Sequence, residues 1–311
     1  MGVNVGVNPT ESAVLPTQAP WASRWMRPLA VASLVVNILI VVTGGVVRLT
    51  GSGLGCPTWP HCDGGSFVPH RALGVHGAIE FSNRMLTFVL AAVAIATFVA
   101  AWRYARPSVL RLAFVLALGV PAQAVIGGIT VLTDLNPWLV AGHLIASMAM
   151  ICVAVLLLRR LGEGDGPAVR SVPDGVTWLV RSIFAAGWAV LYVGTVVTGS
   201  GPHAGDASSP RNGLDPRDIT QLHTDLVFLL VGLTVAAVLV LRTLRSPGLA
   251  QRAAVVLLGV ELAQGTIGFV QYFTALPVVL VTFHLLGAGL LAAAMTWLLV
   301  TVRDRLDAPA T

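Results

Sequence analysis

Eight long apolar runs, nearly free of charge, constrain the fold of this chain more than any other feature. A transmembrane helix needs about 20 mostly apolar residues to cross the hydrocarbon core of a bilayer. Polar connectors rich in Gly, Pro and Arg separate the runs. The sequence therefore predicts membrane-spanning helices at 29–47, 74–101, 109–132, 138–159, 177–198, 219–242, 251–272 and 277–302.

The composition supports a membrane protein and excludes a soluble enzyme, a disordered chain and a disulfide-dense secreted module. Of the 311 residues, 56% are hydrophobic and 11% are charged, whereas soluble domains carry about 25% charged residues. Continuous runs favour helices over the alternating strands of a membrane barrel. The predicted fold class is an all-α membrane protein that crosses the lipid bilayer of the cell several times.

The arginines predict the orientation of the helices. All 19 basic residues are Arg and lie mostly at the ends of the runs, a pattern that argues against a nucleic-acid partner. With both termini in the cytoplasm, 14 arginines face the cytoplasm, one lies within a span and four face outside, as the positive-inside rule requires. The four outside are Arg48, Arg71, Arg211 and Arg217. We therefore expect both termini to be cytoplasmic.

The chain contains an internal repeat. Gln123, Gly127 and His143 recur 141 residues later as Gln264, Gly268 and His284, and 50–53 recur 148 residues later as 198–201. Each repeat unit has four spans, so both units share one orientation. The repeat predicts two pseudo-symmetric four-helix bundles, with two tails and a linker on the cytoplasmic side. The predicted segments are 1–28 (tail), 29–160 (bundle), 161–176 (linker), 177–302 (bundle) and 303–311 (tail).

Three histidines fall at one depth in the predicted outer leaflet. His143, His223 and His284 each lie one to two turns after the start of a span. Ionisable residues inside a membrane are costly and therefore mark functional sites. Paired imidazoles on facing helices are suited to hold haem in a bundle core. A proton relay is the alternative, although it would favour more acids across the membrane than Glu80, Asp225 and Glu261.

The two halves differ at one of these positions. His223 corresponds, at a distance of 140 residues, to Asn83, and Asn is a poor iron ligand. The second half thus offers the pair His223 and His284, which predicts a six-coordinate haem. The first half offers His143 opposite Asn83, with His76 on the same helical face as Asn83. We therefore expect the first-half site to be less symmetric, as is typical of a site where a bound molecule undergoes a reaction.

Glu80 and Arg84 are spaced i,i+4 in the second span. An intrahelical ion pair would make both side chains tolerable in a membrane. In a functional interpretation, Glu80 points at the first-half site and manages protons or a cationic intermediate. The two interpretations are compatible.

Two cysteines lie six residues apart in the Pro-rich loop after the first span. Cys56 and Cys62 could form a structural disulfide, because disulfides persist on the outer side of a membrane. They could instead form an exchanging dithiol, and a zinc site with His61 and His70 is a third, weaker alternative. Cys152, within the fourth span, is expected to be buried packing.

The segments 44–60 (GGVVRLTGSGLGCPTWP) and 79–84 (IEFSNR), with the histidines of spans 4, 6 and 8, resemble the haem A synthase family over 29–302. The resemblance implies eight helices in two bundles and oxidation of the C8 methyl of haem O to a formyl group. That reaction needs two hydroxylations and then loss of water from a geminal diol. The product, haem A, serves terminal oxidases.

The resemblance also implies roles for individual residues. His223 and His284 match the pair that holds haem b, a cofactor expected to relay electrons, and His143 matches one ligand of the substrate-haem site. Glu80 matches an essential carboxylate, Asn83 and Arg84 would line the substrate site, and the matching loop cysteines are Cys56 and Cys62.

The sequence departs from the family pattern at two places, and it contains no motif for a further redox cofactor. The family commonly has His at the position of Asn83, so the substrate haem is either five-coordinate on His143 or bound also by His76. The loop 199–218 has no cysteine, and no flavin or nicotinamide motif is present, so the electron donor or acceptor must be external. A haem O synthase is the expected substrate donor. The alternatives are a quinone-linked b-type cytochrome and a transporter with parallel repeats.

Overall fold

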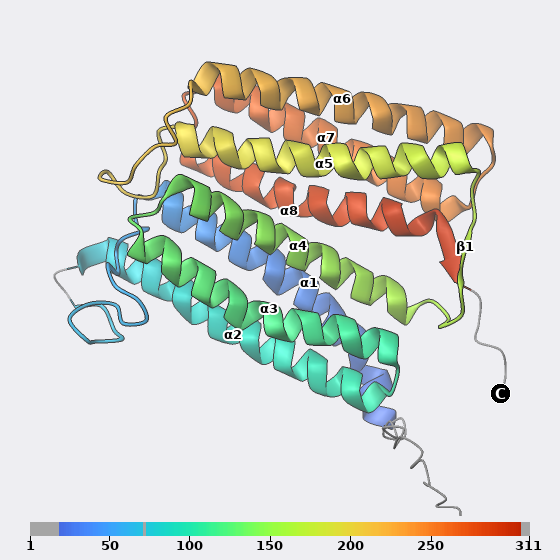
Figure 1. Ribbon diagram of the computed structural model, residues 1–311, viewed down its shortest axis with the longest axis horizontal. Coiled ribbons are helices and arrows are strands. Elements are labelled where there is room, and N and C mark those ends of the chain that lie inside the picture. The colour runs from blue at the N-terminus through green and yellow to red at the C-terminus, as the bar shows by residue number, and fades with distance from the viewer. Residues whose placement is uncertain (1–18, 71–72, 306–311) are drawn as a thin grey trace, which may run out of the picture.

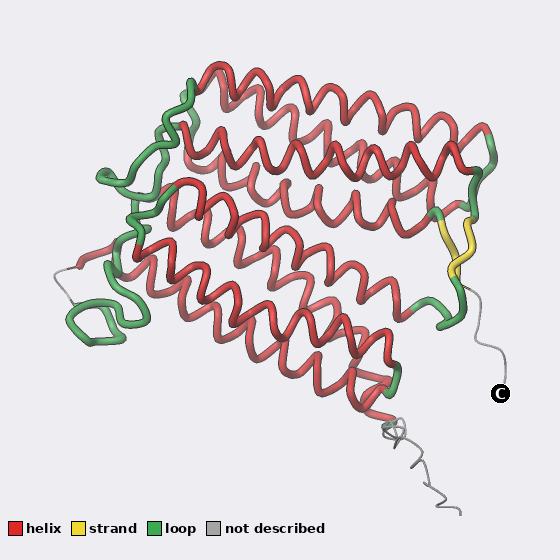
Figure 2. The backbone as a smooth tube through the Cα atoms, in the orientation of Figure 1, coloured by secondary structure: helices red, strands yellow, loops and turns green. Residues whose placement is uncertain are grey.

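The computed structural model describes residues 19–70 and 73–305, and within them the fold is helical apart from one short ribbon (Figures 1 and 2). All eight helices are long and apolar enough to cross a membrane, which confirms a multi-span helical membrane protein. The helices are α1 Pro20–Leu49, α2 Gly74–Tyr104, α3 Pro107–Leu132, α4 Pro137–Leu161, α5 Asp174–Ser200, α6 Pro216–Thr243, α7 Gly248–Phe273 and α8 Val278–Thr301. The strands are β1 Ala168–Arg170 and β2 Arg303–Arg305, paired antiparallel.

The first helix begins earlier than the predicted span. It starts at Pro20, a residue suited to the first helical turn because its missing N–H has no partner there anyway. Ala22 and Met26 are buried, so this early part packs inside the protein although it was predicted to be a tail. The rest of that tail, up to residue 18, and residues 306–311 lie outside the described residues.

The two-stranded ribbon was not predicted. β1 lies in the predicted linker, and β2 directly follows the last helix, where a tail was expected. Three-residue strands carry little hydrophobic pattern, and their pairing partner is far away in the sequence. The ribbon ties the connection between α4 and α5 to the end of α8.

Helix contacts form two closed rings (Figure 1). In the first ring α1 contacts α2, α2 contacts α3, α3 contacts α4 and α4 contacts α1, and α5 to α8 repeat this order. The rings meet where α8 packs against α1 and α4 and where α4 packs against α5. We call the end of the molecule that carries loop 50–73 the disulfide face, and the opposite end, with the ribbon, the terminal face.

The backbone repeats at the turns that precede α4 and α8. Leu135 and Leu276, at equivalent positions, both have positive φ, of 59° and 57°. Each donates its N–H five residues back, Leu135 to Thr130 O at 2.8 Å and Leu276 to Gln271 O at 3.0 Å. The same turn therefore aims α4 and α8 in the same way relative to the helix before each.

The two halves are tied together on the disulfide face. Arg48, at the end of α1, donates from Nε to His203 O at 2.7 Å and from Nη2 to Thr198 O at 3.0 Å. The N–H of Gly53 donates to Gly205 O at 2.8 Å. Gly205 has φ +105°, a conformation that L residues rarely adopt. These bonds fix the first-half loop against the second-half loop.

Candidate functional site

Three histidines lie at one depth below the disulfide face, as predicted. His143 is six residues after the start of α4, His223 seven after the start of α6 and His284 six after the start of α8. All three helices begin at the disulfide face (Figure 1). At 1.5 Å per residue, each imidazole lies roughly 10 Å along its helix.

Each of these rings lies against a glycine of a neighbouring helix. A Cβ atom at Gly127 would lie 3.3 Å from Cε1 of His143, and one at Gly194 would lie 3.1 Å from Cε1 of His223. The corresponding distance from Gly268 to His284 is 3.7 Å. Two of these glycines, Gly127 and Gly268, belong to the sequence repeat, so the repeat preserves the space beside the ring as well as the ring.

One ring nitrogen of each imidazole is buried without a hydrogen-bond partner. Nδ1 of His143, His223 and His284 is buried and makes no hydrogen bond of normal geometry, although the His223 ring lies near the Val190 carbonyl. A buried polar atom is normally satisfied. An imidazole whose Nδ1 atom is left without a partner is suited to bind a ligand or metal through its other nitrogen, Nε2.

A glutamine holds the backbone of each repeated histidine. Gln264 donates from Nε2 to His284 O at 2.8 Å. Gln123 donates to His143 O at 3.3 Å and to Ser147 Oγ at 2.6 Å. These glutamines were recognised in the sequence only as repeat markers, and the matched His–Gln pairs were the signal for this positioning role.

The second-half pair lies inside its ring of helices. α6 and α8 are diagonal members of that ring, each contacting α5 and α7. His223 and His284 lie at matched positions, seven and six residues after the starts of these two helices. Two imidazoles that project from opposite helices into an apolar interior form a suitable donor set for a porphyrin iron.

The first half differs at the opposing helix. Asn83 Oδ1 accepts a hydrogen bond from Thr43 Oγ1 at 2.7 Å. Asn83 and Thr43 also line a groove of about 350 Å³ between α1 and α2. Ala78 and Ser82, on the groove wall, are exposed, so it opens toward the lipid side. The groove thus lies beside Asn83, the residue at the position of His223.

His76 lies at the start of α2, near the disulfide face. Its ring is exposed, and Nδ1 pairs with Ser52 Oγ at 2.9 Å. It precedes Asn83 by seven residues, or about 10 Å along the helix. The structure therefore gives His76 a polar partner in the loop and does not bring it to the depth of the other three histidines.

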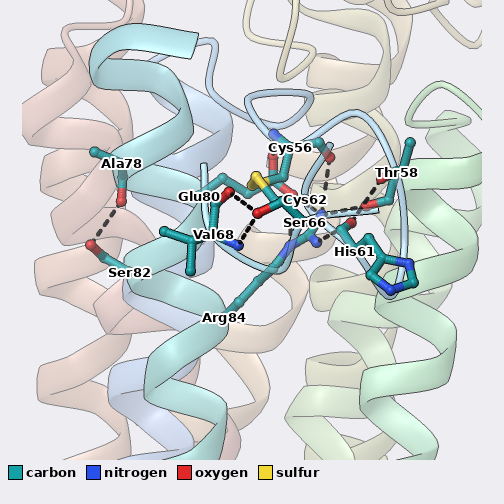
Figure 3. Close-up of a disulfide and its surroundings, with 10 residues drawn as sticks. All are labelled: Cys56, Thr58, His61, Cys62, Ser66, Val68, Ala78, Glu80, Ser82 and Arg84. Carbon is teal, nitrogen blue, oxygen red and sulfur yellow. Dashed lines mark hydrogen bonds and ion pairs between the residues drawn. A yellow bond between two sulfur atoms is a disulfide. The ribbon is translucent and has the colours of Figure 1, made fainter. Parts of the chain in front are cut away.

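Glu80 and Arg84 form the expected ion pair and also bind the loop (Figure 3). Glu80 is 5% exposed, and its Oε1 accepts from Arg84 Nη2 at 2.5 Å. Oε2 accepts the N–H of Cys56 at 2.7 Å. Arg84 donates in turn to Cys56 O at 3.0 Å and to Thr58 O and His61 O at 3.1 and 3.2 Å. These contacts with the loop were not predicted.

Cys56 and Cys62 form a disulfide, as one of the alternatives predicted (Figure 3). Both are buried, and the ring of His61 contacts Phe67. No cluster of three metal-binding side chains occurs within 19–70 and 73–305, and the zinc alternative has no support there. Cys152 is buried in the core, as expected.

The disulfide loop also packs on α3. The indole of Trp59 packs so closely on Gly128 of α3 that a Cβ there would lie 2.3 Å from it. Gly128 follows Gly127, which faces His143. The loop therefore contacts Glu80 of α2 and also packs on α3 next to the glycine that faces His143, a relation that the sequence did not reveal.

The arrangement defines a multi-span membrane protein with three half-buried imidazoles at one depth and a disulfide-closed loop packed on α2 and α3. The model of the cytochrome oxidase assembly protein family matches residues 27–78 and 74–207. This is more than half of the chain, and the chain belongs to that family, whose members include the haem A synthases that the sequence resembles.

Several curated relatives are named haem A synthase. The one from Lysinibacillus sphaericus is 30% identical over 182 residues, 56% of this chain and 58% of the relative. The one from Geobacillus thermodenitrificans is 31% identical over 147 residues, 45% of each chain. The chain spans about half the length of the curated relatives that it matches. Its eight helices and its family make it a multi-pass plasma-membrane protein.

Proposed function

We propose that the chain is a haem A synthase, which oxidises the C8 methyl of haem O to a formyl group. The observation that carries this proposal is the set of three half-buried imidazoles at one depth, each with a buried Nδ1 atom that lacks a partner. Two lie in one ring of helices and one in the other. The name of the curated relatives supports the same activity.

The proposal includes the orientation. The two rings of helices correspond to the two four-helix bundles, 29–160 and 177–302, with the histidines of both in the outer leaflet. Both termini are then cytoplasmic. Arg159, Arg170 and Arg305 all lie on the terminal face, so the face with dense basic charge faces the cytoplasm.

His223 and His284 would hold haem b. Their buried Nδ1 atoms lack partners, and Gly194 and Gly268 leave room beside the rings, so the residues present fit an iron ligand set. Bound haem b supplies one-electron chemistry to the site. The protein's part is to keep both rings fixed, which Gln264 does through the backbone of His284.

His143 would bind the substrate, haem O, at the first half. Asn83 stands where the second half has its additional ligand, and its amide oxygen already accepts from Thr43. The groove beside it gives a membrane-soluble porphyrin a lateral route to the site. An incomplete ligand set suits a haem that must enter, react and leave.

Glu80 would act at the reacting methyl group, with Arg84 and Cys56 as its supports. Glu80 is held by hydrogen bonds to both carboxylate oxygens, and its burial excludes bulk water. A carboxylate in this position accepts a proton or stabilises positive charge at the substrate carbon. The disulfide fixes the backbone that donates to Glu80.

Two partners follow from the chemistry. Oxidation of a methyl group needs a redox partner, and the repeat offers no second cofactor motif, so electrons are exchanged with an external protein or quinone. Haem O is a hydrophobic intermediate, and a haem O synthase in the same membrane is the proposed donor.

Co-expression with a source of haem O tests the function. Extracted pigment from cells with the chain should contain haem A, and cells without the chain should contain only haem O and haem b. Bound haem b without any haem A would instead identify a b-type cytochrome that only transfers electrons. A purified protein that binds no haem would refute both.

A further inference from the structure

A cavity on the terminal face has no part in the proposed haem chemistry. It has a volume of about 400 Å³ and lies between α4, α5 and α8, next to the β1–β2 ribbon. α4 belongs to the first ring and the other two helices to the second, so the cavity lies at the junction of the two halves. Its volume falls in the range of small-molecule sites.

The cavity combines an apolar wall with positive charge. Leu156, Phe184 and Leu299 contribute apolar side chains from the three helices, and no acidic side chain lines it. Its charged residues are Arg170, Arg181 and Arg303. This combination suits an amphipathic anion.

Two of the three arginines have no acidic partner. Arg170 pairs with Asp174 in an exposed ion pair. Arg181 lies over the ring of Trp178 at 5.0 Å. Within 19–70 and 73–305, neither Arg181 nor Arg303 forms an ion pair. Positive charge at the cavity is therefore left uncompensated by the protein.

Other acidic side chains near the cavity pair with arginines that do not line it. Glu163 pairs with Arg159 at 2.7 Å, and Asp165 pairs with Arg106 at 3.0 Å. Asp304 lies 3.3 Å from Arg159 as well. Because these acids are engaged with other arginines, none of them neutralises Arg181 or Arg303 at the cavity.

The cavity lies at the level of lipid headgroups. It is formed at the end of α4, the start of α5 and the end of α8, and the exposed Trp178 beside it is a typical interfacial residue. Basic pockets between transmembrane helices bind anionic lipid headgroups, and guanidinium groups match phosphate geometry.

We propose that the cavity binds one anionic phospholipid, with its phosphate among Arg170, Arg181 and Arg303 and an acyl chain along Leu156, Phe184 and Leu299. The lipid contacts helices of both rings and thereby stabilises their junction. A free phosphate would satisfy the arginines but leave the apolar wall uncovered. This proposal stands independently of the haem chemistry.

Lipid titration of the purified full chain in detergent tests the proposal. The probes are phosphatidylglycerol and phosphatidylcholine with identical acyl chains, and bound lipid is counted by native mass spectrometry while Tm is recorded. We expect phosphatidylglycerol to bind and raise Tm, with phosphatidylcholine doing neither. Affinity should fall about fivefold for each arginine removed in R181Q and R303Q, and about 25-fold in the double variant.

The matched control is R252Q. Arg252 is an exposed arginine near the start of α7 on the same face and does not line the cavity, so this variant should bind like the wild type. Equal phosphatidylglycerol binding by the wild type and the double variant overturns the proposal. Displacement of the lipid by millimolar inorganic phosphate also overturns it, in favour of a free-anion site. If the double variant does not fold, equal binding of both lipids by the wild-type protein overturns the proposal in its place.

Discussion

The two halves of the chain share a backbone plan and differ on one helix of each. His143 and His284 follow identical turns, face equivalent glycines and are held by equivalent glutamines. On the opposing helix, His223 of the second half stands where the first half has Asn83. The repeat thus preserves one imidazole in each half and leaves the opposite position free to change.

The loops on the disulfide face also differ between the two halves. The first is closed by a disulfide and bound by Glu80 and Arg84. At the second-half position of Glu80 stands Thr220, whose hydroxyl only donates to Pro216 O of its own helix. The acid, its arginine and the disulfide therefore occur together, in the half that lacks the second histidine.

The largest expected effect comes from the second-half pair. His284→Ala or His223→Ala should abolish the low-spin haem b spectrum, because each removes one axial ligand. His143→Ala, the matched variant of the first half, should retain that spectrum in full. Reduced-minus-oxidised spectra per mole of purified protein measure both. Loss in His143→Ala together with retention in His284→Ala would reverse the assignment of the halves.

Glu80→Gln should stop the chemistry while sparing haem b. Acid–base groups contribute about 10²- to 10⁴-fold to rates, so haem A yield should fall at least 100-fold, with a hydroxylated intermediate accumulating. The control is Glu261→Gln in the second half, whose Oε1 accepts from Thr234 at 2.8 Å, a bond that an amide also forms. A normal haem A yield from Glu80→Gln would reduce Glu80 to a partner of Arg84 and the loop.

Asn83→His should make the first half resemble the second. A second imidazole opposite His143 should shift the first-half haem from high spin toward low spin and slow turnover several-fold. His76→Ala should change little, because that ring is exposed and pairs with Ser52. Two low-spin haems in loaded wild-type protein, one of which becomes high-spin in His76→Ala, would make His76 the missing ligand.

The smallest effect concerns the terminal face. The hydrogen bond from Arg106, with one from Ser108, lowers the pKa of Asp165 to about 2 and ties the α2–α3 turn to the linker. In the second half, Arg245 of the α6–α7 turn forms no ion pair within 19–70 and 73–305.

Asp165→Asn should therefore lower stability at pH 7, by no more than about 1 kcal/mol because the pair is partly exposed. A depressed pKa stabilises the fold above the unfolded value of about 4, and the benefit disappears as the pH falls toward 2. The difference in Tm between the wild type and Asp165→Asn should therefore be smaller at pH 3 than at pH 7. In an Arg106→Gln background, Asp165→Asn should have almost no effect.

Much of the architecture could be predicted from the sequence. Helices in a membrane must be long and apolar, so the eight spans were visible as runs. The depth of the three histidines followed from counting residues from the helix starts, and the Glu80–Arg84 pair followed from i,i+4 spacing. These are local properties, fixed by helix geometry alone.

The contacts between distant segments could not be predicted. The hydrogen bond from Cys56 N to Glu80, the one from Thr43 to Asn83 and the packing of Trp59 on Gly128 depend on how a loop folds back over a ring of helices. Helical periodicity placed His76 and Asn83 on one face correctly. Periodicity could not show that His76 forms a hydrogen bond with Ser52 of the loop at the start of the helix.

The ribbon has a consequence for the order of biogenesis. Arg305 reaches back to Gly166 O across 139 residues of chain, and β1 has no strand partner until β2 exists. A ribosome must therefore deliver all eight helices to the membrane before the connection between the halves is locked. Until β2 is made, α1 to α4 can assemble while α5 to α8 are still being inserted, and the pairing of β2 with β1 then closes the junction.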